Sequence, residues 1–306
     1  MNYIQNALLS GSTIDNNTEL SALHFDLHKS DSDRALLFVF DEINPFPKYV
    51  AKYAKDPKYE KHLCDQFDSY SQMYNSFSPN LGLHLPKPIG VYDESSTIAT
   101  IEEGVPGRTL ENMIKYYGES KKILNYFKAA FDFLVALHDE TRIDFHFSDE
   151  AIHKFIDTPL SLFFETYRIS PNQRFKIETM KQDVVDYLLQ KSILVSCHGD
   201  FWPNNILVHN NVIYIVDWAL TKEKYLIFWD TCSLIYSVNF KTEKLNSEFK
   251  ELNSYYLRKY DIYRDIESEI RIIYYAIRSV WNNYWHGIHE DYDRHWKIRI
   301  DKELNN

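Results

Sequence analysis

The chain has 306 residues, a length that usually corresponds to about two domains. Hydrophobic residues make up 44% of it, which is enough for sizeable cores, yet no apolar run approaches the roughly 20 residues that a membrane-spanning helix needs. The formal net charge of −10 argues against non-specific binding of nucleic acid. This charge is compatible with a cationic ligand, although a generally soluble surface explains it equally well.

The first residues, Met1 to Asn6, have neither the basic region nor the apolar region of a secretory signal peptide. The three cysteines, Cys64, Cys197 and Cys232, are scattered, and their spacing favours neither a disulfide framework nor a zinc site. We therefore expect a cytoplasmic protein with no membrane partner and no nucleic-acid partner. The sequence leaves the oligomeric state open.

Residues 1 to about 56 are predicted to be mainly strand. The apolar run Arg34–Asp41 and the alternating run Lys48–Tyr53 are typical of two strands joined by a proline-containing turn. Ahead of them, Ala7–Thr13 is the one candidate for a glycine-containing loop over phosphates. Because that run has a single glycine, Gly11, an ordinary surface turn is at least as consistent with it.

A helix is predicted to follow, because Asp56 can cap it and Pro57 suits its first turn. Two further strands, Pro86–Tyr92 and Ser96–Ile101, precede a glycine- and proline-containing loop and a largely helical remainder. Apolar stripes at helical spacing mark the main helices of that remainder: Ile123, Phe127, Phe131, Leu134 and His138; then Ile177, Met180, Val184 and Leu188; then Ile270, Ile273, Tyr274, Ile277 and Val280.

One stretch within this helical part combines short apolar strands with polar loops. Ile193–Val195 is predicted to be a buried strand. Ile206–Val208 and Val212–Val216 are predicted to form a hairpin that turns at His209–Asn211, since asparagine tolerates positive φ. The loop before this hairpin reads Cys197-His198-Gly199-Asp200-Phe201-Trp202-Pro203-Asn204-Asn205, and Asp217-Trp218 follows it. Two carboxylates and an amide therefore lie at strand ends on loops that a rigid scaffold holds.

This arrangement suits phosphoryl transfer. The chemistry needs an acidic group to orient and deprotonate an attacking hydroxyl, and oxygen ligands for Mg²⁺. Asp200 is the candidate base, and Asn205 and Asp217 are the candidate metal ligands. The alternative is a structural hairpin with solvated polar turns, but the spacing, the strand context and the downstream aspartate together favour the catalytic interpretation.

The run His198–Leu207, followed by Val216-Asp217-Trp218, resembles the aminoglycoside phosphotransferase and choline kinase family of small-molecule kinases. The resemblance implies a two-lobed, protein-kinase-like α+β fold. Residues 1–103 would form a small nucleotide-binding lobe on an antiparallel β-sheet, and residues 104–306 a larger, mainly helical catalytic and substrate-binding lobe. It also implies Mg²⁺-dependent transfer of the γ-phosphate of ATP, or of GTP, to a hydroxyl of a sugar, amino alcohol or aminoglycoside-like acceptor.

The resemblance suggests how the nucleotide is held. Lys52, in Val50-Ala51-Lys52, matches the strand lysine that contacts the α- and β-phosphates and pairs with an acidic residue on the next helix. Gln66 stands where the family usually has that glutamate, which is a departure from the pattern. Glu60, one turn earlier on the same stripe, could substitute for it.

The linker between lobes is expected to begin with Glu102, Glu103 and Gly104, whose backbone groups correspond to those that bind the nucleotide base. After the hairpin, twelve residues separate Asp217 from Asp230. That segment is short for the activation loop of a regulated protein kinase. We expect Asp230 to cap the next helix and to brace the catalytic loop.

Three functions compete: a small-molecule kinase, a protein kinase, and a nucleotide-binding pseudokinase that acts as an interaction module. The short segment after Asp217 argues against the second. Intact Asp200, Asn205 and Asp217 argue against the third, for which Gln66 and the few glycines leave some room. Near the end of the chain, aromatic side chains could cage a quaternary ammonium, as in choline-type kinases, or simply pack between helices; they are Trp281, Tyr284, Trp285, His286 and Trp296.

Overall fold

The computed structural model describes residues 20–26, 34–41, 44–94, 97–117, 120–238, 243–262, 264–286, 298–301 and 304. The predicted loop Ala7–Thr13 lies outside this range, as does Trp296, and the side chains of residues 281–286 are also outside the description. Neither the glycine loop nor the aromatic cage can be placed, and both stay predictions.

The amino-terminal part is built on one antiparallel sheet with the strand order β1-β2-β3-β5-β4. Its strands are β1 (Leu20–Asp26), β2 (Arg34–Asp41), β3 (Tyr49–Ala54), β4 (Pro88–Glu94) and β5 (Thr97–Glu103). Val39, Tyr49, Ala51 and Ile101 contribute to a small core in this sheet. The predicted strand Arg34–Asp41 is confirmed at both ends.

The helix predicted after Asp56 is also confirmed. The Asp56 carboxylate accepts a hydrogen bond from the Lys58 backbone N–H at 3.1 Å and caps a single 3₁₀ turn, η1 (Pro57–Tyr59), which continues into α2 (Glu60–Ser76). A short helix, α3 (Pro79–Gly82), follows it. The Tyr70 hydroxyl of α2 donates to the Pro86 carbonyl at 2.5 Å and so ties the helix to the chain entering β4.

Two small three-stranded sheets lie beyond the linker, with the orders β10-β9-β6 and β11-β8-β7. Their strands are β6 (Arg108–Thr109), β7 (Ile143–Asp144), β8 (Ile193–Cys197), β9 (Ile206–His209), β10 (Val212–Ile215) and β11 (Lys222–Leu226). The β9–β10 hairpin turns at Asn210 and Asn211, whose φ angles are 48° and 65°. The prediction that asparagines would form this turn at positive φ is therefore confirmed.

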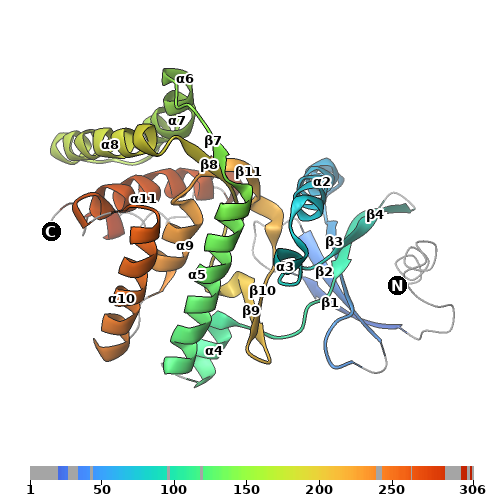
Figure 1. Cartoon of the computed structure of the whole chain (residues 1–306). Helices are drawn as coiled ribbons and strands as arrows, with labels where there is room; N and C mark the ends of the chain where they lie inside the picture. Colours follow the sequence, from blue (N-terminus) through green and yellow to red (C-terminus); the bar gives the residue numbers. More distant parts are fainter. Residues whose placement is uncertain are drawn as a thin grey trace.

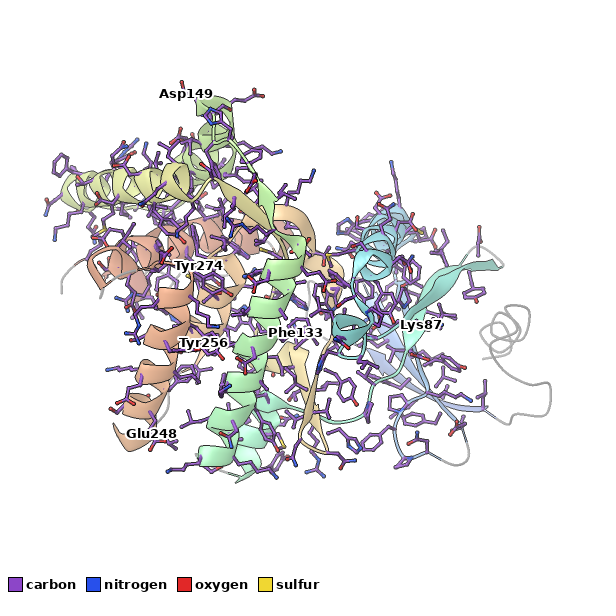
Figure 2. The ribbon with its side chains drawn as sticks, viewed as in Figure 1. Lys87, Phe133, Asp149, Glu248, Tyr256 and Tyr274 are labelled. Atoms are coloured by element: carbon purple, nitrogen blue, oxygen red, sulfur yellow. The ribbon has the colours of Figure 1, made fainter. Side chains whose placement is uncertain are left out.

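Helices make up most of the remaining chain (Figure 1): α4 (Leu110–Tyr117), α5 (Lys121–Thr141), α6 (Asp149–Ile152), a π-helical turn η2 (His153–Asp157), α7 (Thr158–Thr166), α8 (Pro171–Lys191), α9 (Trp229–Ser237), α10 (Glu243–Lys259) and α11 (Arg264–His286). Every member of the predicted α5 stripe is buried. Aromatic contacts join the helices: Tyr256 of α10 stacks on Phe131 of α5 with ring centroids 4.5 Å apart. Figure 2 shows Tyr256 between α10 and α5.

Figure 1 shows the five-stranded sheet with α2 and α3 on one side of the molecule and the helices on the other, with the β9–β10 hairpin between them. This is the expected α+β arrangement of a small antiparallel-sheet lobe and a larger helical lobe. The lobe boundary at residues 103 and 104 stays a prediction. No helix of the described part of the chain is both long and apolar enough to cross a lipid bilayer.

His138, the last residue of the predicted apolar stripe of α5, is buried in the core. It is 2% exposed, and its Nδ1 lies 3.1 Å from the Tyr260 hydroxyl. Burial lowers its pKa from 6.5 to about 3. In the unfolded chain the imidazole takes up a proton near its ordinary pKa, whereas in the folded protein it stays neutral until much lower pH. The folded state therefore loses stability as the pH falls through this range.

We expect the free energy of unfolding to fall by about 3 kcal/mol between about pH 7 and pH 4.5 through His138 alone. Urea unfolding at the two pH values measures this loss, and His138→Gln should show correspondingly less of it. His146→Gln, at an exposed position, is the matched control and should behave as wild type. Equal acid sensitivity of His138→Gln and wild type would contradict the assignment.

Candidate active site

The loop between β8 and β9 has a backbone that requires glycine at position 199. Gly199 has φ +85°, and a Cβ built there would lie 2.1 Å from the Leu220 carbonyl oxygen. Any side chain would meet backbone at that distance, so the loop and the segment after Asp217 can pack this closely only with glycine. Gly199 precedes the β9–β10 hairpin and Leu220 follows it. Their close contact therefore brings these two segments together next to Asp200.

His198 joins the two halves of the candidate site. Its Nδ1 accepts from the Asp200 backbone N–H at 3.2 Å, and its Nε2 donates to the Val216 carbonyl at 2.9 Å. These partners require a neutral ring with the proton on Nε2. Burial lowers the pKa of His198, against the opposing effects of the Val216 carbonyl and of Asp200 and Asp217. The ring thus stays neutral and fixes the residue before Asp217 relative to Asp200.

Asp230 braces the same loop from α9. Its carboxylate accepts from the backbone N–H groups of His198, at 2.6 Å, and Gly199, at 3.0 Å, and the Trp229 indole N–H donates to the Gly199 carbonyl at 3.2 Å. Burial raises the pKa of Asp230 to about 7, although the two backbone hydrogen bonds act to lower it. The predicted bracing role is confirmed. The predicted capping role is wrong, because Asp230 lies inside the first turn of α9 and Phe228 occupies the N-cap.

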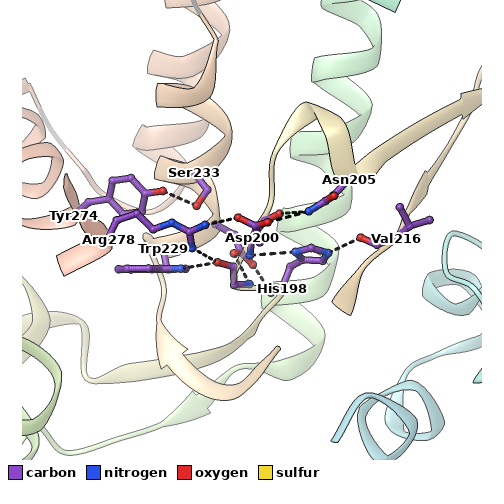
Figure 3. A network of polar contacts seen from close by, with 10 residues as sticks. His198, Asp200, Asn205, Val216, Trp229, Ser233, Tyr274 and Arg278 are labelled. Carbon is purple, nitrogen blue, oxygen red and sulfur yellow. Dashed lines mark hydrogen bonds and ion pairs between the residues drawn. The ribbon is translucent and has the colours of Figure 1, made fainter. Parts of the chain in front are cut away.

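Both carboxylate oxygens of Asp200 have partners (Figure 3). Asn205 Nδ2 donates to Asp200 Oδ2 at 3.2 Å and to the Asp200 carbonyl at 2.8 Å. Arg278 of α11 pairs with Oδ1 and donates to the Gly199 carbonyl at 2.7 Å. The sequence analysis missed Arg278. The signal was present, since this arginine stands one turn after Tyr274 and next to Ile277 on the apolar stripe of α11.

Asp217 ends the hairpin in a left-handed backbone conformation, with φ 64° and ψ 60°. Its carboxylate is half exposed and lies 4.0 Å from Lys52 Nζ. The Val216 N–H donates to the Asn205 carbonyl at 2.9 Å, which holds the residue before Asp217 beside Asn205. Two carboxylates and one amide from separate loops therefore gather at one end of the hairpin, opposite a lysine from the amino-terminal sheet.

The described ion pairs of Lys52 are with Glu102 and Asp217. The Glu102 carboxylate lies 3.0 Å from Lys52 Nζ and is buried on β5. Burial raises the pKa of Glu102, whereas Lys52 acts to lower it. Gln66 Nε2 instead lies 2.9 Å from His62 Nε2, and Glu60 accepts from the Ile98 N–H at 3.4 Å. Glu102, expected to act through its backbone, thus supplies the side chain next to Lys52.

The other linker residues are held by the sheet. The Glu103 N–H donates to the Lys87 carbonyl and the Gly104 N–H to the Lys48 carbonyl, each at 2.8 Å. A Cβ at Gly104 would lie 2.0 Å from the Pro47 carbonyl oxygen, so this position also needs glycine. The backbone N–H groups of Glu103 and Gly104 are therefore both hydrogen-bonded to carbonyls of the protein itself.

A cavity of about 30 Å³ lies between α2 and β5, and Gln66 and Trp218 line it together with Lys52 and Glu102. Trp218 stacks on Tyr70 with ring centroids 5.7 Å apart, and both rings line this cavity. The cavity therefore brings Gln66 of α2 next to the Lys52–Glu102 pair.

Replacement of Glu102 by glutamine should destabilise the protein by about 1–3 kcal/mol, because the variant keeps the shape of the side chain but leaves the Lys52 ammonium without its buried counter-charge. Glu60→Gln removes a carboxylate from α2 and should change stability by less. Urea unfolding of the two variants at one pH measures the difference. A larger effect of Glu60→Gln would mean that α2, rather than β5, supplies the partner of Lys52.

Comparisons with known proteins support a common fold and a family. The chain matches the phosphotransferase enzyme family over residues 39–227, which is more than half of its length. No curated protein matches it by sequence. Among solved structures, a thermostable mutant of an aminoglycoside phosphotransferase in a ternary complex with ADP and hygromycin B is similar over 98% of this chain and 97% of that chain, with 12% identity and a TM-score of 0.60.

Two further structures give the same result. Choline kinase LicA from Streptococcus pneumoniae covers 100% of this chain and 99% of its own, with 15% identity and a TM-score of 0.60. Macrolide 2'-phosphotransferase MphH from Brachybacterium faecium covers 100% of this chain and 98% of its own, with 12% identity and a TM-score of 0.58. At these identities the likeness concerns the fold, and it confirms the expected two-lobed kinase-like architecture.

Proposed function

Because the chain belongs to the phosphotransferase enzyme family, we propose that it transfers the γ-phosphate of ATP or GTP to a hydroxyl group of a small molecule. One observation carries the proposal: Asp200, Asn205 and Asp217 lie at the same end of the β9–β10 hairpin. Asn205 contacts Asp200 there, and His198 and the Val216–Asn205 hydrogen bond join the two segments. Phosphoryl transfer relies mainly on positioning and on neutralisation of charge, and this cluster supplies groups suited to both.

In the proposed mechanism, the Asp200 carboxylate orients the acceptor hydroxyl and takes its proton as the oxygen attacks. Asn205 and Asp217 would hold Mg²⁺, because amide and carboxylate oxygens are the ligands that this hard cation prefers. When bound, the ion would neutralise charge on the nucleotide phosphates. Lys52 would contact the phosphates from β3, and Glu102 would keep its ammonium in place.

The segment after Asp217 supports a small-molecule acceptor. It is filled by a 3₁₀ turn, η4 (Trp218–Leu220), and by β11, and α9 begins at Trp229. Little chain is left for a long activation loop that would present a protein substrate. We place the nucleotide base near the linker at Glu102, Glu103 and Gly104, with the lobes meeting there. The acceptor would lie on the helical side, next to Asp200.

The acceptor class can be found by following ADP or GDP formation. Separate reactions with Mg²⁺ and either nucleotide should contain sugars, amino alcohols including choline, nucleosides, or aminoglycosides including hygromycin B. We expect one class to stimulate nucleotide consumption above the rate without acceptor. Nucleotide binding without stimulation by any class, together with phosphate on a protein partner, would contradict a small-molecule acceptor.

A further inference from the structure

Arg278 reaches the candidate base from a helix far away in the sequence. It lies on α11, and its side chain is 5% exposed. Through its two terminal nitrogens the guanidinium contacts consecutive groups of the catalytic loop, the Gly199 carbonyl at 2.7 Å and the Asp200 carboxylate (Figure 3). A buried charge next to a catalytic group calls for an explanation, because burying an arginine is unfavourable unless it is paired.

We propose that Arg278 is a positioning residue that acts through Asp200 in phosphoryl transfer, an inference that rests on the function proposed above. Asn205 holds Oδ2 of Asp200 at 3.2 Å and Arg278 holds Oδ1. With one donor on each oxygen, the carboxylate cannot rotate about its Cβ–Cγ bond without breaking a hydrogen bond. The plane of the carboxylate, and with it the direction in which the acceptor hydroxyl is held, is then fixed before substrate binds.

A purely structural role explains less of the geometry. Asp230 already holds the loop through two backbone N–H groups, and Trp229 already donates to the Gly199 carbonyl. The added feature of Arg278 is its bond to the side chain of the base. The planar guanidinium can span both groups from one side, whereas a lysine ammonium is a point charge without this fixed fork.

The surroundings keep the guanidinium charged and in place. Burial acts to lower the pKa of Arg278, but Asp200, Tyr274 and Asp230 together outweigh it and raise the pKa. The indole of Trp202 lies with its ring centroid 5.9 Å from the guanidinium carbon. On the same helix, the Tyr274 hydroxyl bonds to Ser233 at 2.7 Å, and its ring packs edge-on against Trp229. These contacts anchor α11 to α9 one turn before Arg278.

The titratable groups around Asp200 come from several elements. They are His198 on its own loop, Asp230 on α9, and Tyr274 and Arg278 on α11, while Asp217 and Lys52 act on His198 from the other side. Within this described set, Arg278 is the cation that touches the Asp200 carboxylate. Its removal should therefore leave Oδ1 of Asp200 without the donor that fixes the plane of the carboxylate.

The test compares Arg278→Met, which keeps much of the length but loses the charge, with Arg278→Lys, which keeps the charge but loses the fork. We expect Arg278→Met to lower kcat by about 10²-fold, with KM values little changed. Arg278→Lys should lower kcat too, because its ammonium cannot span both groups. Arg271→Met, on the same helix but away from the loop, is the matched control and should retain wild-type kcat.

A second measurement distinguishes a local loss of the Arg278 contact from a general loss of folding. It is hydrogen exchange of the peptide covering residues 198–205. In Arg278→Lys we expect faster exchange in this peptide than in wild type, with the rest of the helical lobe unchanged. If wild type transfers no phosphate, the proposed function fails while this measurement still tests the contact. A folded Arg278→Lys with wild-type exchange, or with wild-type kcat, would overturn the positioning role.

Discussion

Asp200→Asn is expected to lower kcat by about 10²–10⁴-fold while leaving the binding of the Mg²⁺-nucleotide close to that of wild type. Asparagine preserves the shape of the side chain and can still accept a hydrogen bond from Arg278. It cannot take the proton of the acceptor hydroxyl. Steady-state kinetics with the identified acceptor gives kcat, and a calorimetric titration with the nucleotide gives the affinity.

A matched control for this substitution is Asp183→Asn on the exposed face of α8, which should leave both quantities unchanged. Thermal unfolding of the two variants checks that Asp200→Asn is folded. Equal turnover of Asp200→Asn and wild type would exclude Asp200 as the base. If Asp200→Asn lost both nucleotide binding and turnover, Asp200 would instead be a residue that binds the Mg²⁺-nucleotide.

Asp217→Asn should weaken the binding of the Mg²⁺-nucleotide and lower turnover by about 10²-fold or more, since a neutral amide is a poorer ligand for the cation than a carboxylate. Asparagine is the informative replacement, because Asp217 has φ 64° and asparagine tolerates this left-handed conformation. The backbone, and with it the hydrogen bond from Val216 to Asn205, should be preserved.

The readout that separates Asp217 from Asp200 is the dependence on Mg²⁺ concentration. For Asp217→Asn, raising Mg²⁺ should recover part of the lost activity, whereas for Asp200→Asn it should recover none. If Asp217→Asn bound the nucleotide as tightly as wild type at every Mg²⁺ concentration, the assignment of this residue as a metal ligand would be wrong.

Local patterns predicted much of the scaffold. The strand Arg34–Asp41, the cap at Asp56 and the hairpin turn at Asn210-Asn211 each follow from a short run of residues, and the structure contains all three. Asp200 and Asn205, which the sequence motif pairs, are also in direct side-chain contact in the structure. These features depend on neighbours in the sequence, for which periodicity and turn chemistry are good guides.

The contacts that were missed join residues far apart in the chain. Glu102 contacts Lys52 because β3 and β5 are adjacent in the sheet, and Arg278 contacts Asp200 because α11 lies next to the loop between β8 and β9. No local pattern distinguishes a glutamate whose side chain turns inward from one that offers only its backbone. A charged residue on an apolar helical stripe was the one available signal for Arg278. Such a residue indicates that a partner of opposite charge is buried nearby, but the sequence does not show which residue that partner is.

The most direct test of the proposed chemistry is a search for the phosphorylated product itself. Wild type and Asp200→Asn should each be incubated with ATP or GTP and Mg²⁺ and a mixed pool of sugars, amino alcohols, nucleosides and aminoglycosides, and the products read by mass spectrometry. We expect one acceptor whose mass increases by a phosphoryl group with wild type and Mg²⁺. The same acceptor should be unmodified with Asp200→Asn or when Mg²⁺ is chelated. No product from wild type, together with no detectable binding of either nucleotide, would contradict the proposed chemistry.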